Sequence, residues 1–282
     1  MWKSPLAWPT NRETLDLFLR HFAIPTTAPP RATLSRVIGA FARLPYENLT
    51  KIVLEVDVRG GMRSLRTPRE VIEGYIRWGA GGTCFALTAT LLHLIRALGF
   101  RAEPILADRR YGADTHCALL VWLEELPQLV DPGYLIVEPV PLVGRGVIEL
   151  RTSFNEVALT PHDDGLKWDL STRQHGSLVY RLTLKASPVD ESQFLRAWEA
   201  SFEWEMMKYP VLTRVVGEAQ TYLQGRRLQT RTHDKVERSE LTEDEWATRM
   251  AGEFGLSPEL VRAALRAWER RGEQPGSPSS SS

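Results

Sequence analysis

The first third of the chain places its hydrophobic residues three and four positions apart, which is the spacing of one face of an α-helix. Thr67 and Glu70 form a capping box around Pro68, and Gly99 lies where a helix should end. The intervening stretch 44–50 is predicted to be a turn. Together these signals predict a helical subdomain over residues 1–98, with helices at residues 15–22, 34–41, 68–78 and 84–98.

After Arg101 the hydrophobic period changes to two, which is typical of β-strands. The predicted strands are rich in Val, Leu and Ile and are separated by polar turns. They cover residues 102–107, 116–123, 129–131 and 178–185. The pattern predicts a β-sheet or small barrel over residues 99–190.

The last third of the chain mixes both periods. A helix over residues 191–207, ended by Pro210, should connect to a mixed α/β lobe that extends to residue 271. Within this lobe we expect two or three strands between residues 213 and 238, followed by helices at 243–254 and 258–270. Residues 272–282 are rich in Ser, Pro and Gly and are predicted to be disordered. The fold class is therefore α+β.

Composition and charge are those of an ordinary soluble globular protein. The chain has 282 residues, of which 43% are hydrophobic and 25% charged, and 35 basic residues balance 35 acidic ones. This balance argues against a nucleic-acid surface or an acidic-membrane surface. No leader or membrane span is evident, so we expect a cytoplasmic protein whose two cysteines, Cys84 and Cys117, are free thiols. The oligomeric state stays open.

Cys84 follows the glycine-rich run 79–82 and opens the fourth predicted helix. A helix N-terminus carries unpaired N–H groups and a partial positive charge, which can lower a thiol pKa from about 8.5 toward neutrality. Cys84 is therefore a candidate nucleophile. The alternative is a small buried residue beside a turn.

A catalytic cysteine needs a base and a group that orients the base. His116 begins one predicted strand, and Asp131 ends the next one, before Pro132 and Gly133. If these strands are antiparallel neighbours, the start of one lies beside the end of the other, so the two side chains can meet. Alternatively, His116 is a core or edge histidine and Asp131 begins an ordinary Asp-Pro-Gly turn.

Other chemistry-bearing residues fit a site less well. Cys117 follows His116 on a strand, so the two side chains should point to opposite faces and not line one site. Arg109 and Arg110 are predicted at a hairpin tip with solvated charges. His93 should lie on a helix face. No CxxC pair or HExxH motif is present, so we expect no metal site.

Three segments resemble motifs of the arylamine N-acetyltransferase family. Residues 44–49, LPYENL, resemble its PFENL segment, and 81–85, GGTCF, resemble its RGGxCF segment. Residues 131–134, DPGY, resemble its DVGFG segment, with His116 in the expected order between them. The C-terminal lobe, with its GRRL stretch at 225–228, is similar in layout. The resemblance thus covers most of the chain.

This resemblance implies a papain-like cysteine-triad core in three lobes: helical, β-barrel and α/β lid. It implies a cysteine acyltransferase in which Cys84 takes an acetyl or other acyl group from acyl-CoA, with His116 as general base and Asp131 orienting it. The group then passes to a small-molecule arylamine, hydrazine or other amine. Gly133 and Tyr134 would contact substrate. Acetyl-CoA would be a co-substrate, and no cofactor would be bound permanently.

The chain also departs from the family motifs. Ala80 replaces the arginine before the glycine pair, and Ala86 and Thr88 replace polar residues after the cysteine, which predicts loss of a polar network beside the nucleophile. Pro132 and Leu135 replace the valine and the last glycine of DVGFG.

Two other functions stay open. A transglutaminase-like amidase, peptidase or amide synthase would share the pattern of residues 82–133, and a non-catalytic member of the fold would keep it without turnover.

Overall fold

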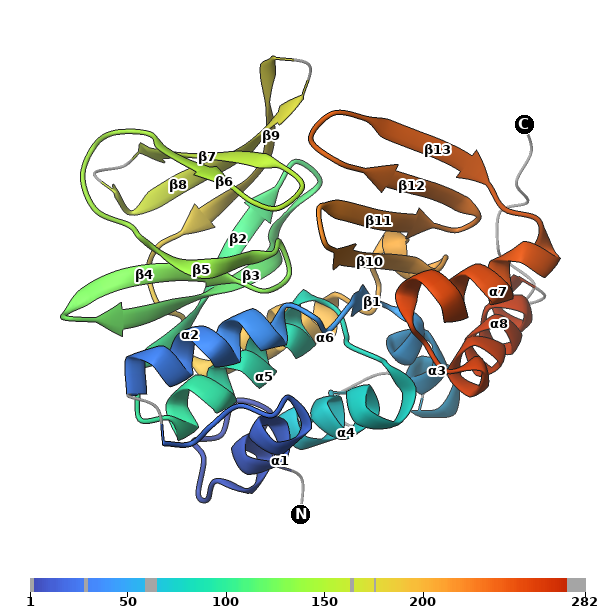
Figure 1. The fold of residues 1–282 in the computed structure, drawn as a ribbon, viewed down its shortest axis with the longest axis horizontal. Coiled ribbons are helices and arrows are strands. Elements are labelled where there is room, and N and C mark those ends of the chain that lie inside the picture. Colours follow the sequence, from blue (N-terminus) through green and yellow to red (C-terminus); the bar gives the residue numbers. More distant parts are fainter. Residues whose placement is uncertain (1–2, 28–29, 59–64, 163–164, 175, 273–282) are drawn as a thin grey trace.

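The computed structural model of the protein describes residues 3–27, 30–58, 65–162, 165–174 and 176–272. Figure 1 shows a layer of helices with two β-sheets standing side by side on it. Helices α7 (Glu243–Phe254) and α8 (Pro258–Gly272) lie beside the second sheet. This architecture confirms the predicted α+β fold class. No helix of the described residues is long and apolar enough to cross a membrane, and the predicted disordered tail lies outside them from residue 273 onward.

The four predicted N-terminal helices are confirmed. They are α1 (Glu13–His21), α2 (Pro30–Phe41), α4 (Pro68–Trp78) and α5 (Cys84–Ala97). The predicted capping box at Thr67 and Glu70 starts α4, and Gly79 ends it in the left-handed conformation, with φ of 68°. Every residue from Cys84 to Leu92 is buried, so α5 is the central helix of the core.

The sequence predicted a turn over residues 44–50, and this prediction is wrong. It contains strand β1 (Tyr46–Glu47) and the start of helix α3 (Leu49–Val58). Strand β1 pairs with a strand more than 160 residues later, with Tyr46 opposite Thr213. The Glu47 carboxylate accepts hydrogen bonds from the backbone N–H and the hydroxyl of Thr50, which fixes the first turn of α3. Long-range pairing and this cap thus override the local turn pattern.

The first sheet is antiparallel and curls into a half-barrel (Figure 1). Its order is β5-β4-β3-β2-β9-β8-β7-β6. Strands β5 and β7 each contain proline, which disfavours a strand, and β6 has only four residues. The sequence pattern did not predict these three or β8. The strands are β2 (Ala102–Arg109), β3 (Gly112–Leu123), β4 (Leu126–Asp131), β5 (Ile136–Pro141), β6 (Ile148–Arg151), β7 (Glu156–His162), β8 (Lys167–Gln174) and β9 (Ser177–Lys185).

The helix after the first sheet is shorter than predicted. Helix α6 (Glu191–Ala200) ends ten residues before Pro210, and the Ser201 hydroxyl donates a hydrogen bond to the Trp198 carbonyl at this end. A separate 3₁₀ turn, η3 (Glu205–Met207), follows. Trp198 is buried and stacks on Phe85 of α5 at a ring distance of 6.2 Å, so it is a core residue. The helix thus ends at Ser201, well before Pro210.

The second sheet contains four C-terminal strands, whereas the sequence predicted two or three. Its order is β1-β10-β11-β12-β13, so an N-terminal strand completes a C-terminal sheet. Helices α7 and α8 pack beside it on a core that includes Trp246 and Phe254. The strands are β10 (Val211–Val216), β11 (Ala219–Gln224), β12 (Arg227–Arg231) and β13 (Val236–Glu240).

Candidate active site

His116 and Asp131 meet as the strand register predicts. His116 lies on β3, Asp131 is the last residue of β4, and both side chains are fully buried. The His116 Nε2 atom is 2.7 Å from Asp131 Oδ2, and the Tyr134 backbone N–H donates to Asp131 Oδ1 over 2.8 Å. Burial alone would lower the pKa of His116, but the charge and hydrogen bond of Asp131 raise it to about 9. The carboxylate of Asp131 therefore favours the imidazolium form of His116.

Cys84 is the first residue of α5, and the side chains of Cys117 and His116 both lower the pKa of its thiol. Since Asp131 occupies Nε2, the nitrogen of His116 left for the thiol is Nδ1. The hydrogen bond from Cys117 lowers the pKa of Cys84 most, burial opposes it, and His116 and Arg109 lower it further. The resulting pKa is well below the ordinary thiol value, which favours the thiolate form of Cys84.

Cys117 affects the nucleophile, although the sequence predicted that it would not line the site with His116. Its side chain does face the helical core, opposite to His116, but the β3–β4 ladder ends at the Leu119–Val130 pair. Beside His116 and Cys117, β3 is therefore paired with β2 but not with β4. Burial raises the pKa of Cys117 well above the ordinary value, which favours its protonated form.

Gly133 closes the space between nucleophile and base. A Cβ atom at this position would lie 2.9 Å from Cys84 Cβ, closer than real Cβ atoms approach, and 3.0 Å from His116 Cε1, which is tighter than most real contacts. Tyr134 places its ring edge-on to the His116 ring at 6.3 Å, and burial raises the pKa of its phenol to about 12. Leu135, at the position of the last family glycine, has a φ of 65°, so the turn keeps a glycine-like conformation without glycine. The turn after Asp131 therefore packs directly on the Cys84–His116 pair.

Arg109 is a site residue that the sequence interpretation missed. Its guanidinium is partly buried, with Nη2 3.1 Å from His116 Nδ1 and Nη1 2.9 Å from the Tyr111 hydroxyl. The prediction of a solvated charge is thus wrong for Arg109, whereas Arg110 is exposed. The register of this hairpin pairs Ala107 with His116 and Arg109 with Gly112, which brings Arg109 to the base. The sequence alone does not fix that register.

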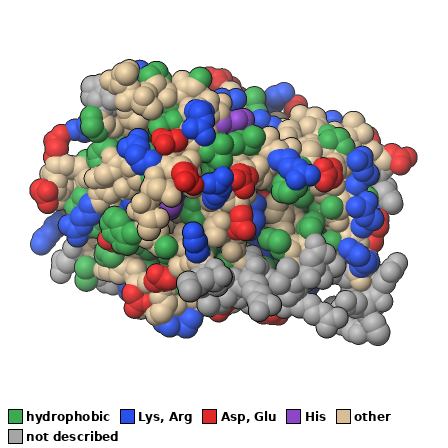
Figure 2. Space-filling model, turned by 90° about the horizontal axis from the view of Figure 1, so that it is seen from below, with side chains coloured by type: hydrophobic (Ala, Val, Ile, Leu, Met, Phe, Trp, Pro, Cys, Tyr) green, Lys and Arg blue, Asp and Glu red, His purple; other side chains and the backbone are tan. Residues whose placement is uncertain are grey.

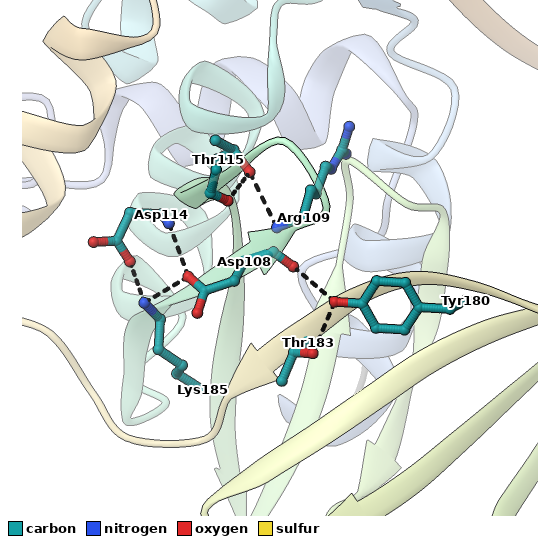
Figure 3. Close-up of polar contacts among 8 residues, drawn as sticks. Asp108, Arg109, Asp114, Thr115, Tyr180, Thr183 and Lys185 are labelled. Carbon is teal, nitrogen blue, oxygen red and sulfur yellow. Dashed lines mark hydrogen bonds and ion pairs between the residues drawn. The ribbon is translucent and has the colours of Figure 1, made fainter.

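The β2–β3 hairpin that carries Arg109 is anchored by polar contacts (Figure 3). The Thr115 hydroxyl accepts a hydrogen bond from the Arg109 backbone N–H and donates one to the Gly112 carbonyl. Lys185 binds the carboxylates of both Asp108 and Asp114. Figure 3 shows the Arg109 guanidinium pointing away from these acidic groups. The neighbouring Asp108 therefore does not neutralise Arg109.

A buried polar network does lie beside the nucleophile, contrary to the prediction from Ala80. Arg66 donates a hydrogen bond to the Gly81 carbonyl and lies 3.8 Å from the fully buried Glu47 carboxylate. Gly81 passes so close to the Pro45 carbonyl that a side chain there would clash. An arginine outside the motif thus holds the glycine run that leads to Cys84.

A cleft of about 590 Å³ opens beside Gly133 between the two sheets. Tyrosines and arginines dominate its lining, which contains no aspartate or glutamate. In contrast, the face shown in Figure 2 intersperses basic and acidic side chains. Among the described residues, no cluster of three or more His, Cys, Asp or Glu side chains could hold a metal ion. The arginines of the cleft are Arg109, Arg110, Arg181, Arg231 and Arg238.

Solved structures of several bacterial enzymes share this fold at low sequence identity. The arylamine N-acetyltransferase from Mycobacterium abscessus has a TM-score of 0.76 at 19% identity, covering 90% of this chain and 94% of its own. The enzyme from Nocardia farcinica has a TM-score of 0.74 at 21% identity, with coverages of 96% and 100%. The Bacillus cereus enzyme, described as having a unique Cys-His-Glu triad, has a TM-score of 0.69 at 17% identity, with coverages of 87% and 99%.

Comparison of the sequence itself identifies the family. No curated protein matches the sequence significantly. The family model described as N-acetyltransferase, however, matches residues 32–262, which is most of the chain. The protein therefore belongs to the arylamine N-acetyltransferase family and is an acetyltransferase of that type.

Proposed function

We propose that the protein transfers an acetyl or other acyl group from acyl-CoA, through a thioester on Cys84, to an arylamine, hydrazine or other amine. The observation that carries this proposal is the buried chain from Cys84 through His116 to Asp131, with the pKa of the thiol lowered and that of the imidazole raised to about 9. A thiolate that exists at neutral pH can attack a thioester without prior deprotonation.

In the first half-reaction, the Cys84 thiolate attacks the thioester carbonyl carbon. The bond from that carbon to the CoA sulfur then breaks, and the imidazolium of His116 gives its proton to the departing CoA thiolate. In the second, the amine attacks the Cys84 thioester, neutral His116 takes a proton from the amine, and the bond to Cys84 sulfur breaks. Asp131 holds the ring orientation and stabilises the imidazolium in both steps.

The cleft suits a polyanionic donor. Burial, and after it the charges of Arg181 and Arg238, lower the pKa of Arg231, so these three arginines form a concentrated positive region. Phosphate groups of CoA would bind there by charge-assisted hydrogen bonds. Gly133 and Tyr134 line the same cleft, which supports their proposed contact with substrate.

The test is CoA release from acetyl-CoA and other acyl-CoA thioesters, measured with and without an arylamine or hydrazine. We expect a stoichiometric burst without amine and continuous release with it, both abolished in Cys84→Ala. Amide hydrolysis that needs no CoA would instead indicate an amidase or peptidase. Absence of turnover with an unreactive Cys84 would indicate a non-catalytic member of the fold.

A further inference from the structure

Two tyrosines of the cleft stand where the family motifs have phenylalanine. The PFENL and DVGFG segments correspond to residues 45–49 and 131–135, and their phenylalanines align with Tyr46 and Tyr134. Both tyrosines line the cleft between the two sheets, and both are half-buried. Each replacement adds one oxygen atom, so the wall of this cleft gains two phenol hydroxyls.

The backbone fixes Tyr46 beside the nucleophile. Tyr46 forms a parallel bridge with Gly82, two residues before Cys84, and the backbone N–H of Glu47 donates to the Gly82 carbonyl over 3.0 Å. The Tyr46 hydroxyl donates to the Met206 Sδ atom at 3.9 Å. A thioether sulfur is a weak acceptor, so this hydroxyl can form a stronger hydrogen bond with an oxygen atom of a ligand.

Tyr134 is fixed beside the base. Its backbone N–H donates to Asp131 Oδ1 over 2.8 Å, and its ring lies edge-on to the His116 ring at 6.3 Å. Among the described residues, the Tyr134 hydroxyl has no hydrogen-bond partner. Burial raises the pKa of Tyr134 to about 12 and raises the pKa of Tyr46 well above its ordinary value. Both phenols therefore keep their protons at neutral pH and can donate them in hydrogen bonds.

We infer that the amine acceptor carries a second polar group, a hydroxyl or carbonyl oxygen, which the hydroxyls of Tyr46 and Tyr134 bind. This inference rests on the proposed function and specifies the class of acceptor. The amine attacks the thioester on Cys84 and gives its proton to His116. The rest of the amine therefore lies against the residues that surround this pair, and both tyrosines are among them.

An apolar amine would fit this wall poorly. It would remove water from the two hydroxyls without replacing the lost hydrogen bonds, whereas an oxygen on the amine would replace them. The transfer step itself is unchanged: the carbon–nitrogen bond forms, the bond to the Cys84 sulfur breaks, and the proton of the amine goes to His116. Tyr46 and Tyr134 are thus specificity-determining residues.

The experiment compares aminophenols with methylanilines, as the 3- and 4-isomers, because a hydroxyl and a methyl group have similar size. Acetyl-Cys84 is first formed with acetyl-CoA, and its decay after addition of each amine is followed by mass spectrometry. We expect at least one aminophenol to react faster than its methyl counterpart. Tyr46→Phe and Tyr134→Phe should each lower this rate ratio by about two- to tenfold, the value of a neutral hydrogen bond.

The double variant should bring the ratio to that of the same amines reacting with a simple acetyl thioester in solution. Phenylalanine is the family residue at both positions, so the variants should keep the native thermal melt. Tyr180→Phe is the matched control, because it removes the same atom from another tyrosine of the cleft, whose hydroxyl is bound to Thr183 at 2.9 Å (Figure 3). It should leave the ratio unchanged.

Two results would overturn the inference. One is a native ratio equal to the ratio in solution, and the other is a double variant that keeps the native ratio. An effect of the two variants confined to acylation by acetyl-CoA would also overturn it and would place the contact on the donor. A native protein that forms no acetyl-Cys84 would overturn the proposed function itself, and the inference with it.

Discussion

Replacing Asp131 with asparagine should convert the Cys84 thiolate largely into a neutral thiol. The pKa of His116 is about 9 in the protein, against an ordinary value of about 6.5, a difference equivalent to roughly 3 kcal/mol. Asp131 is the group that raises it, since burial acts in the opposite direction. Loss of its charge should lower the population of the thiolate–imidazolium pair by up to about 300-fold.

The asparagine side chain is nearly isosteric but cannot satisfy both partners of Asp131. If its oxygen accepts from the Tyr134 N–H, its amide nitrogen donates to His116 Nε2 and forces the ring proton onto Nδ1. That tautomer cannot take the proton of Cys84. The structure thus predicts a chemical defect with little change in packing.

The assay is the rate of Cys84 alkylation by iodoacetamide at pH 7. A thiol of higher pKa is intrinsically more nucleophilic, so the rate should fall less than the thiolate population, by about 10- to 100-fold. In the native protein the rate should stay high below the ordinary thiol pKa and fall only as pH drops through the lowered pKa of Cys84. In Asp131→Asn the rate should rise only as pH approaches about 8.5.

Asp108→Asn is the matched control, because this carboxylate lies on the neighbouring strand β2 and binds Lys185 rather than His116. It should leave the alkylation profile unchanged. A native-like profile in Asp131→Asn, with an unchanged thermal melt, would refute the assignment of Asp131 as the group that sustains the ion pair. A collapsed melt would assign Asp131 a structural role.

Three further predictions concern neighbouring residues. Gly133→Ala should abolish acylation, because the added methyl group would clash with Cys84. Gly146→Ala is the control and should keep acylation, because a Cβ there meets no atom within 4 Å. Equal activities of the two variants would contradict the close packing of Gly133 on Cys84. Cys117→Ala should raise the pKa of Cys84, which would appear as an alkaline shift of the alkylation profile. Cys117→Ser should restore the lower pKa. An unshifted profile in the alanine variant would show that Cys117 does not lower the pKa of Cys84. Arg66→Met should destabilise the fold by about 3 kcal/mol in denaturant unfolding, because the buried Glu47 carboxylate loses its cation and keeps only the hydrogen bonds from Thr50; unchanged stability would contradict this pairing.

Local sequence signals predicted the elements that local physics determines. The capping box at Thr67 and the helical spacing after Cys84 identified α4 and α5, and strand order brought His116 to Asp131. These features depend on contacts between residues close in sequence or on adjacent antiparallel strands. They can therefore be recognised in the amino-acid sequence.

The missed features depend on contacts between distant segments. Tyr46 belongs to a strand only because β10 pairs with it. Arg66 reaches the Gly81 carbonyl from 15 residues earlier in the chain, and Arg109 reaches the base through a hairpin register that the sequence does not specify. Cys117 joins the site because β4 ends before it. None of these placements follows from residue spacing alone.

The most direct test of the account is the site of covalent acylation. The protein is incubated with a reactive acyl thioester, quenched in acid and mapped by peptide mass spectrometry. The account predicts acyl groups on Cys84 and not on Cys117, with labelling strongly reduced in His116→Ala, because the pKa of Cys84 is lowered and that of Cys117 is raised. Acylation of Cys117 in preference to Cys84, or labelling of Cys84 that is unaffected by His116→Ala, would contradict it.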